Sequence, residues 1–474
     1  MARDYDGQAP LPAGDVLEEA CGVVGVYAPN NEVARLAYFG LYALQHRGQE
    51  SAGIAVSDGA SIVCHREMGL ISSIFDEEIL GRLSGYIAVG HTRYSTTGSS
   101  VVVNAQPLLE RAGFGDLALA HNGNLTNTEV LTQALDPATV LQATSDSEVL
   151  AKRIVQAPGG DMIARIRSVM ERAEGAYSVV MSTERTLYAF RDPWGVRPLC
   201  YGKFATGGYM VASESCALAT VGAEYVRELE PGEILWVDVD GLHFDRAPQP
   251  RPHALCMFEY IYFARPDSLL SGSSIYMARL AMGRRLAREH PAEADVVMAV
   301  PDSAIPGGMG FAEESGLPYV EGLIKNRYIG RTFISPEQGL RARGVQLKFN
   351  PIVELLREKR VVVVDDSIVR GTTTPRIVRL VREAGAREVH VRITSPPIVH
   401  PCYLGVDMAS HEELIAANNS IEEIRQKIGA DSLGYLSVRG LLESVGRKRG
   451  EMCLGCLTGE YPETYAGPVV AGVR

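Results

Sequence analysis

Two kinds of hydrophobic pattern divide the chain. Between residues 175 and 239, short runs rich in β-branched and aromatic residues, such as 176–181, alternate with turns. This spacing is typical of antiparallel strands in two stacked sheets. Farther along, the run 361–364 is continuously apolar, and 295–300 is apolar after Asp295, which predicts parallel strands buried on both faces. The sequence therefore predicts two domains with different sheets.

The segment between these halves has the composition of a linker. Residues 241–254 are rich in Pro, Arg and His, as expected of an exposed connection between domains. A helical stretch, 276–290, opens the second half. We therefore expect a domain boundary near residue 254.

The most informative stretch is V-V-V-V-D-D-S-I-V-R-G-T-T-T, residues 361–374. Its apolar strand ends at Asp365 and Asp366, and ligands of open parallel sheets bind beyond the carboxyl ends of the strands. Gly371 permits a tight turn, and the threonines after it add hydroxyls to the backbone N–H groups that open a helix from Arg376 onward. This combination predicts a phosphate-binding loop beside two carboxylates. Acid pairs at strand ends also occur in phospho-acceptor and dinucleotide-binding folds.

Two further segments are expected beside this loop. The strand 295–300 is followed by a loop that contains Ser303, which belongs opposite the acid pair or, alternatively, caps a helix. Residues 325–350 are basic within an acidic protein and are punctuated by glycines. This composition suits either a solvated loop or a lid that closes over a phosphorylated ligand.

Composition narrows the function classes. The chain has 474 residues, of which 46% are apolar and 22% charged, and a net charge of −11. These values are typical of a globular protein of two domains and argue against a nucleic-acid-binding surface. No apolar run is long enough to span a bilayer, and the first twenty residues lack the features of a secretory signal. We therefore expect a cytoplasmic protein.

The first half carries five motifs in a fixed order. They are C-G-V-V-G-V (21–26), L-Y-A-L-Q-H-R-G-Q-E-S (41–51), G-H-T-R-Y-S-T-T-G (90–98), H-N-G-N-L-T (121–126) and S-D-S-E (145–148). A cysteine that opens a strand is most often a buried small hydrophobe. In this order, however, the motifs resemble the glutamine-hydrolysing domain of the class II amidotransferases, which are N-terminal-nucleophile hydrolases.

The chemistry explains the position of Cys21. A thiol needs a base to become a thiolate at neutral pH, and no Cys/His pair is evident in the sequence. A free α-amino group can serve as that base, with a pKa of about 8, if Cys21 is itself the N-terminus. Residues 1–20 are then expected to be a propeptide that is removed between Ala20 and Cys21.

The resemblance also implies roles for other residues of the first half. Asn122 and the backbone N–H of Gly123 would form the oxyanion hole for the tetrahedral intermediate. Arg93 would bind the α-carboxylate of glutamine, with Thr96 beside it. Asp146 would bind the α-ammonium group.

In the second half, residues 361–374 resemble the phosphoribosyl pyrophosphate (PRPP) motif of the phosphoribosyltransferases. The resemblance implies that the acid pair holds the ribose hydroxyls and that Ser303 joins it around Mg²⁺. The PRPP contacts implied in this way are Asp365, Asp366, Ser367, Arg370, Gly371, Thr372, Thr373, Lys325 and Arg327. Lys325 and Arg327 belong to the basic segment, which the resemblance identifies as a flexible lid.

The cysteines divide into two groups. Cys453 and Cys456 have the C-x-x-C spacing of a metal site, and Cys256 and Cys402 complete four thiolates if the fold brings them together. Structural zinc is the alternative, and a disulfide is not expected in a reducing cytosol. The remaining cysteines, Cys64, Cys200 and Cys216, are expected to be inert core residues.

Together, both halves resemble the glutamine PRPP amidotransferases, and the H-P-C and C-x-x-C motifs resemble their iron–sulfur branch. The fold implied is α/β and α+β in two domains. Residues 21–254 would form an N-terminal-nucleophile hydrolase αββα sandwich, and residues 255–474 a phosphoribosyltransferase-type parallel α/β sheet with a C-terminal cluster-binding segment.

The activity implied is hydrolysis of glutamine and transfer of the ammonia to PRPP, with Mg²⁺ and a [4Fe–4S] cluster as cofactors. A homotetramer inhibited by purine nucleotides, with no nucleic-acid or membrane partner, is also implied. One alternative is an amidotransferase with a sugar-phosphate acceptor. Another is a nucleotide-sensing regulator without catalytic activity.

Overall fold

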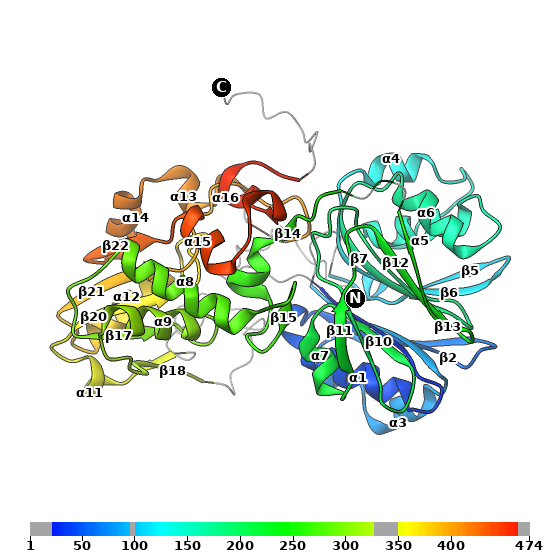
Figure 1. Cartoon of the computed structure of the whole chain (residues 1–474), viewed down its shortest axis with the longest axis horizontal. Helices are drawn as coiled ribbons and strands as arrows, with labels where there is room; N and C mark the ends of the chain where they lie inside the picture. The colour runs from blue at the N-terminus through cyan, green and yellow to red at the C-terminus, as the bar shows by residue number, and fades with distance from the viewer. Residues whose placement is uncertain are drawn as a thin grey trace, which may run out of the picture.

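The computed structural model describes residues 21–94, 100–247, 249, 251–326, 349–406, 408 and 410–462. Figure 1 shows two domains side by side, the first coloured blue to green and the second green to red. The predicted combination of a two-sheet domain and a parallel-sheet domain is confirmed. The predicted boundary at 254/255 stays a prediction, and the expected propeptide, residues 1–20, lies outside the described residues.

The first domain consists of two antiparallel sheets with helices on their outer faces (Figure 1). Within the described residues, one sheet has the order β11-β9-β10-β1-β4-β2-β3 and the other β13-β12-β8-β7-β6-β5. The strands of the first sheet are β1 (Gly22–Tyr27), β2 (Ser51–Ser57), β3 (Ile62–Met68), β4 (Ile87–Arg93), β9 (Cys200–Lys203), β10 (Tyr209–Ala212) and β11 (Glu224–Glu228). Those of the second are β5 (Leu108–Ala112), β6 (Gly115–Leu125), β7 (Gly175–Ser182), β8 (Leu187–Arg191), β12 (Glu233–Asp238) and β13 (Gly241–Arg246).

The helices of this domain divide between the two sheets. Helices α1 (Val33–Ala43), α2 (Ile71–Ile74), α3 (Glu77–Arg82) and α7 (Ser215–Thr220) share a core with the first sheet. Helices α5 (Asp146–Gln156) and α6 (Met162–Met170), with α4 (Thr128–Gln133), share a core with the second. Short 3-10 turns lie at Gln45–Arg47 and Val102–Asn104.

Strand β1 shows why the sequence reads as a continuous apolar run. Side chains alternate between the faces of a strand, so Val24 and Val26 pack against the helices while Val23 packs between the two sheets. Because both faces are covered, both sets of positions are apolar. The strand thus leads directly from Cys21 into the middle of the sandwich.

The expected linker begins later than predicted. Residues Gly241–Arg246 form β13, which pairs with β12 along its whole length. The interpretation of 241–246 as linker was therefore wrong, because an edge strand with half-exposed polar residues has the composition of a loop. The connection between the domains follows β13.

The second domain is built on a parallel sheet with the order β17-β20-β21-β22 in the described part of the chain. Its strands are β17 (Val296–Ala299), β20 (Arg360–Asp365), β21 (Glu388–Ile393) and β22 (Ser432–Tyr435). Smaller strands are β14 (Leu255–Cys256), β15 (Leu269–Leu270), β16 (Ser273–Ser274), β18 (Leu323–Lys325), β19 (Phe349–Pro351) and β23 (Met452–Cys453). No helix among the described residues is long and apolar enough to cross a membrane.

Helices cover both faces of this sheet (Figure 1). Helices α8 (Ile275–Glu289), α9 (Ile305–Ser315) and α15 (Val438–Val445) pack on one face, and α12 (Thr374–Glu383) and α14 (Ile421–Ile428) on the other. The short elements are α11 (Val353–Leu356), α13 (Ile415–Asn418), α16 (Gly455–Thr458), the π-helix η3 (Glu259–Phe263) and the 3-10 turn η4 (Arg449–Glu451). Along β20, Val362 and Val364 face the first group of helices and Val361 and Val363 the second, so the strand is apolar on both sides.

Glycines let α8 and α9 approach each other closely. A Cβ at Gly310 would lie 2.0 Å from the carbonyl oxygen of Leu280, and one at Gly283 would lie 1.9 Å from that of Gly307. Backbone therefore contacts backbone where the helices cross. This crossing fixes α9, whose N-terminus follows the Ser303 loop.

We predict that Gly310→Ala destabilises the second domain by about 1–3 kcal/mol, because the added methyl must push the two helices apart. Gly81→Ala in α3 is the matched control, since no described atom lies within 4 Å of its Cβ position. It should stabilise the protein by up to about 1 kcal/mol through helix propensity. Calorimetric unfolding midpoints measure both, and a Gly310→Ala midpoint at or above wild type would contradict the predicted clash.

Candidate active sites

The first candidate site surrounds Cys21, which precedes β1. Its Sγ lies 3.4 Å from the backbone N of Tyr94, which donates to it, and 3.3 Å from the Tyr94 carbonyl oxygen, to which the thiol donates. Burial raises the pKa of the Cys21 thiol above its ordinary value, and the Tyr94 backbone and Arg93 offset this only in part. The side chain is therefore a buried, neutral thiol in this form of the chain.

Asn122 lies on β6 in the facing sheet and has unused hydrogen-bonding capacity. Its side chain is fully buried, and neither the amide nitrogen nor the amide oxygen has a partner in the described part of the chain. Buried polar groups are nearly always paired, because an unpaired one costs about 1–3 kcal/mol. The amide is therefore available for a ligand that the fold itself does not supply.

Gly123, the next residue of β6, could not be replaced by another amino acid. Its φ is +146°, and a Cβ would lie 1.9 Å from the carbonyl oxygen of Ala176 on β7. The conformation is one that residues with side chains rarely adopt. Strand β6 thus carries an unpaired side-chain amide at Asn122, followed by a glycine with a positive φ at Gly123.

Two charged side chains complete this site. Arg93, at the end of β4, has its Nη1 3.4 Å from Oε1 of Glu50. Asp146, the first residue of α5, accepts a hydrogen bond from the Leu125 N–H at 2.9 Å. The charges of Arg93, Glu50 and Asp146 all act on the Cys21 thiol, so a cation, two carboxylates and the thiol lie near one another. Thr96 lies outside the described residues.

His121 contacts Asp146, and no role was assigned to it from the sequence. Its Nδ1 lies 3.1 Å from the Ser147 hydroxyl and 3.8 Å from Oδ1 of Asp146. Burial lowers the pKa of His121 below its ordinary value, against the opposing charge of Asp146, so the imidazole is neutral. The sequence signal was the histidine at the start of H-N-G-N, but its contact with Asp146 depends on the fold.

The second candidate site lies at the carboxyl end of β20. The hydroxyl of Ser303 donates to Oδ2 of Asp366, and that of Ser367 donates to Oδ1 at 2.8 Å. Burial raises the pKa of Asp366, against these hydroxyls and the charge of Arg279, which lower it. The predicted placement of Ser303 opposite the acid pair thus agrees with the structure. The N-cap alternative does not, because α9 begins at Ile305 with Ala304 at the cap.

Arg279 was missed by sequence reasoning. It is a buried residue of α8, and it donates to the carbonyl oxygens of Tyr260 and Ala264 at 2.8 Å each. An arginine within an apolar helical pattern gives no local sign that its charge acts on Asp366. Only the packing of α8 against the sheet brings the two together.

The loop after the acid pair has the predicted shape. Gly371 has a φ of +72°, and a Cβ there would lie 2.3 Å from Cδ1 of Ile415. The helix α12 begins at Thr374 with Thr373 at the cap position, two residues earlier than the predicted start at Arg376. Residues 367–373, with Thr372 among them, therefore form a hydroxyl-rich loop at a helix N-terminus, and such loops bind phosphate.

The basic segment is only partly described. Lys325 donates from Nζ to Oδ2 of Asp302 at 2.6 Å, so its ammonium lies beside the Ser303 loop. Arg370, in the loop itself, has its Nη2 3.8 Å from Oε2 of Glu413. Arg327 and the rest of the expected lid up to residue 348 lie outside the described residues.

The four cysteines of the expected cluster gather on one side of the second domain. Cys256 on β14 lies opposite Cys453 on the parallel strand β23. Burial raises the pKa of Cys456, and Cys402, Cys256 and Cys453 raise it further through their charge. All eight cysteines, which the described residues include, are free thiols. No group of three or more His, Cys, Asp or Glu residues in the described part is arranged to hold a single metal ion.

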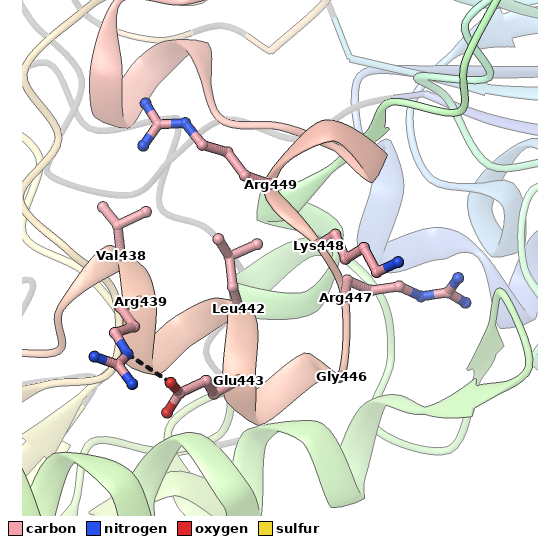
Figure 2. Close-up of a pocket in the computed structure, with 8 residues that line it drawn as sticks. All are labelled: Val438, Arg439, Leu442, Glu443, Gly446, Arg447, Lys448 and Arg449. Carbon is pink, nitrogen blue, oxygen red and sulfur yellow. Dashed lines mark hydrogen bonds and ion pairs between the residues drawn. The ribbon is translucent and has the colours of Figure 1, made fainter.

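A separate surface cavity of about 410 Å³ lies over α15. Figure 2 shows that Val438, Leu442 and the Arg439–Glu443 ion pair line it from the helix, and residues 446–449 from the segment after it. None of the candidate catalytic residues contributes to it. The chemistry of the side chains, not cavity size, therefore identifies the two sites.

Comparison with known proteins identifies two domain families. Residues 91–220 match a glutamine amidotransferase domain, and residues 271–394 match a phosphoribosyl transferase domain. A Synechococcus elongatus protein named amidophosphoribosyltransferase is 51% identical over 98% of this chain and 95% of its own length. One of the same name from Archaeoglobus fulgidus is 50% identical over 94% and 99%.

Solved structures agree with these matches. The glutamine PRPP amidotransferase from B. subtilis, complexed with ADP and GMP, superposes with a TM-score of 0.89 at 48% identity, over 95% of this chain and 99% of that chain. A second structure, described as the allosteric regulatory enzyme of purine biosynthesis, also has a TM-score of 0.89 and 48% identity, over 93% and 96%.

The buried thiol yields a prediction about the full-length chain. Because the pKa of Cys21 is raised, less thiolate is present at neutral pH than for an exposed cysteine, and its alkylation by iodoacetamide should be slow at pH 7. The rate should increase with pH up to the raised pKa. Peptide mass spectrometry of the Cys21 peptide measures it, and a rate at pH 7 equal to that of a free cysteine peptide would contradict the assigned environment.

Proposed function

This chain belongs to the amidophosphoribosyltransferase family, and we propose that its two candidate sites perform the two halves of the family's reaction. The enzyme hydrolyses glutamine and transfers the ammonia to PRPP, giving 5-phosphoribosylamine, pyrophosphate and glutamate, the first step of de novo purine synthesis. The alternatives of a sugar-phosphate acceptor and of a regulator without catalytic activity are set aside, because the relatives match over nearly the full chain.

The observation that carries the glutamine half is the fully buried, unpaired amide of Asn122 on β6. The same strand is bonded through Leu125 to Asp146, whose charge acts on the buried Cys21 thiol. The thiolate of Cys21 attacks the side-chain carbonyl carbon of glutamine, and the oxygen acquires negative charge. The Asn122 amide and the Gly123 N–H donate to that oxyanion, a contribution of about 10²–10³ in rate for a single donor. A γ-glutamyl thioester forms as ammonia leaves, and water then hydrolyses it to glutamate.

Substrate orientation in this half is assigned to two charges. Arg93, with Thr96, binds the α-carboxylate of glutamine, and Asp146 binds the α-ammonium group. The neutral imidazole of His121 supports Asp146 without competing for the substrate's charge. These contacts fix the side-chain amide of glutamine over Cys21.

The base of this half is the α-amino group of Cys21 after removal of residues 1–20. It takes the thiol proton and gives it to the departing ammonia. The raised pKa of the Cys21 thiol supports this assignment, since a buried thiol needs a base beside it. Among the described residues, no histidine is recorded in contact with the Cys21 sulfur.

In the second half, ammonia attacks the anomeric carbon of PRPP while the bond to pyrophosphate breaks. Asp365 and Asp366 hold the ribose hydroxyls, and the loop of Ser367, Arg370, Gly371, Thr372 and Thr373 holds the 5'-phosphate. Lys325 and Arg327 contact the pyrophosphate from the lid segment. The hydroxyl-rich loop at the start of α12 supports this arrangement.

Phosphoribosyltransferases generally use Mg²⁺. The oxygen atoms of Asp365, Asp366 and Ser303 suit this ion, which favours oxygen ligands together with substrate phosphates. The raised pKa of the buried Asp366 also fits, because a bound cation would offset the burial that disfavours its charged form. When bound, Mg²⁺ supplies charge neutralisation of the pyrophosphate leaving group.

We assign a [4Fe–4S] cluster to Cys256, Cys402, Cys453 and Cys456. The thiols are close enough to act on one another's pKa, and the C-x-x-C spacing of Cys453 and Cys456 suits a metal site. Four cysteine thiolates are the ligand set of a [4Fe–4S] cluster. A bound cluster would cross-link the segments of the second domain that carry these four cysteines.

The proposals for regulation and assembly rest on the resemblance to the relatives. The complex of the B. subtilis structure with ADP and GMP supports inhibition of this enzyme by purine nucleotides. We also propose a homotetramer and a cytoplasmic location. Among the described residues, none of the cysteines forms a disulfide, which agrees with a reducing compartment.

The function is tested by separating the two half-reactions. Mature Cys21→Ala should lose all glutamine-dependent product yet still form phosphoribosylamine from PRPP and ammonia. Asp365→Asn should do the reverse, with PRPP turnover at saturating ammonia reduced and basal glutaminase retained. Glutamate and pyrophosphate assays measure both, and glutaminase activity in Cys21→Ala would remove Cys21 from its role.

The cofactor is tested by metal analysis. Anaerobically purified protein should be brown and contain about four irons per chain, the content of one [4Fe–4S] cluster. Cys453→Ser should lose the colour, whereas Cys64→Ser, outside the group, should keep it. A colourless, active protein with one zinc per chain would assign the site to zinc.

A further inference from the structure

The segment around Gly405 in the second domain lies directly against strand β6 of the first domain, which carries Asn122 and Gly123. Gly405 has a φ of +92°, and a Cβ there would lie 2.8 Å from the carbonyl carbon of Gly123 and 3.0 Å from the nitrogen of Asn124. The absence of a side chain at Gly405 is therefore what allows the two backbones to touch. The contact is with the peptide that follows the proposed oxyanion donor.

Two side chains of the first domain hold this segment in place. Buried Arg197 donates from Nε at 3.0 Å and from Nη2 at 2.6 Å to the carbonyl oxygen of Leu404. Asn124 donates from Nδ2 to the carbonyl oxygen of Tyr403 at 2.9 Å. The two carbonyl groups that precede Gly405 in the chain are thus held by side chains of the first domain.

The motif R-D-P-W-G-V-R-P, residues 191–198, orients Arg197 and has no other role assigned above. Arg191 donates from Nε to the Arg197 carbonyl oxygen at 2.6 Å. Asp192 accepts from the N–H groups of Trp194 at 2.9 Å and Val196 at 3.0 Å. The turn is therefore closed by its own side chains, and the guanidinium of Arg197 points out of it toward Leu404.

The segment is also tied to the acid-pair loop on both sides of Gly405. The N–H groups of Thr394 and Ser395 donate to the carbonyl oxygens of Asp365 and Asp366, each at 2.9 Å. After the segment, the N–H of Ile415 donates to the Val369 carbonyl oxygen, also at 2.9 Å. Gly405 is thus carried by backbone that is anchored to the second domain before and after it.

We infer that Gly405 and Arg197 are positioning residues for glutamine hydrolysis: the second domain, through Gly405, forms a wall against the Cα of Gly123 and the peptide after it, and so holds the Gly123 N–H in place as an oxyanion donor. The inference rests on the proposed function, since it assumes that Gly123 has that role. An oxyanion donor acts only when it is held at hydrogen-bond distance from the developing charge. Catalytic geometry must be held to about 0.5 Å, and rigid backbone on either side of the peptide supplies this constraint.

The main test is Gly405→Ala in the mature holoenzyme. The added methyl must displace the Cα of Gly123 and the peptide after it, whereas it has no contact with Arg93 or Asp146. We expect kcat for glutamine to fall by a factor of about 10 or more. KM for glutamine, ammonia-dependent synthesis and iron content should stay within about twofold of wild type, the split expected of a transition-state effect.

Gly429→Ala is the matched control, because Gly429 has a φ of +74° and no described atom within 4 Å of its Cβ position. It imposes the same kind of backbone strain without the contact and should leave kcat for glutamine unchanged. Arg197→Lys, which keeps the charge but not both donors to Leu404, should give a smaller fall in kcat with the same unchanged KM.

Two results separate the possible failures. Equal kcat values for glutamine in Gly405→Ala and Gly429→Ala overturn the inference, as does a Gly405→Ala enzyme in which both half-reactions fall together. A wild-type enzyme without glutaminase activity, or without synthesis from ammonia, instead overturns the proposed function.

Discussion

A buried arginine joins the two domains and the backbone of Cys21 in one network of charges and hydrogen bonds. Arg47 donates to Glu214 at 2.6 Å, to both oxygens of Glu259 at 2.9 and 2.7 Å, and to the carbonyl oxygen of Cys21 at 3.2 Å. Burial alone would lower the pKa of Arg47, but the two carboxylates raise it above its ordinary value. Loss of one member of such a group costs roughly 3–5 kcal/mol, because the remaining charge is left buried and uncompensated.

This network constrains how the domains can be arranged. Glu214 belongs to the first domain and Glu259 to η3 of the second, and the Arg197 guanidinium also lies 3.7 Å from Glu259. Arg197 also donates to the carbonyl oxygen of Leu404. The Arg197 side chain therefore connects the charges around Cys21 with the backbone around Gly123. The proposed glutamine site therefore lies at the contact between the domains, even though its candidate residues belong to the first.

Both sites contain a buried group whose charged form burial disfavours. Burial raises the pKa of Cys21 and of Asp366 alike, and each lies at the end of a strand whose faces are covered by apolar side chains. Low polarity strengthens every charge interaction that a substrate then makes. The apolar strands that build the cores thus also set the electrostatics of the sites.

The sequence by itself determined the local features of this protein. Alternation and continuous apolar runs predicted the strands, and the acid pair and Gly371 predicted the loop after β20, because strand faces and turn conformations depend on neighbouring residues. The thiol at Cys21 and the C-x-x-C pair could also be identified as candidate reactive or metal-binding groups, because residue type and local spacing are read directly from the sequence. The family was accessible because its motifs are short, contiguous and ordered.

Only the tertiary structure decided what depends on residues far apart in the chain. Residues 241–246 are a strand because β12 is there to pair with them, and Ser303 binds Asp366 because parallel strands bring their ends together. The unpaired amide of Asn122 and the contact of Gly405 with Gly123 have no local signature at all. Such contacts are set by the path of the whole chain, because burial and hydrogen bonding depend on all the surrounding elements and not on the residues adjacent in sequence.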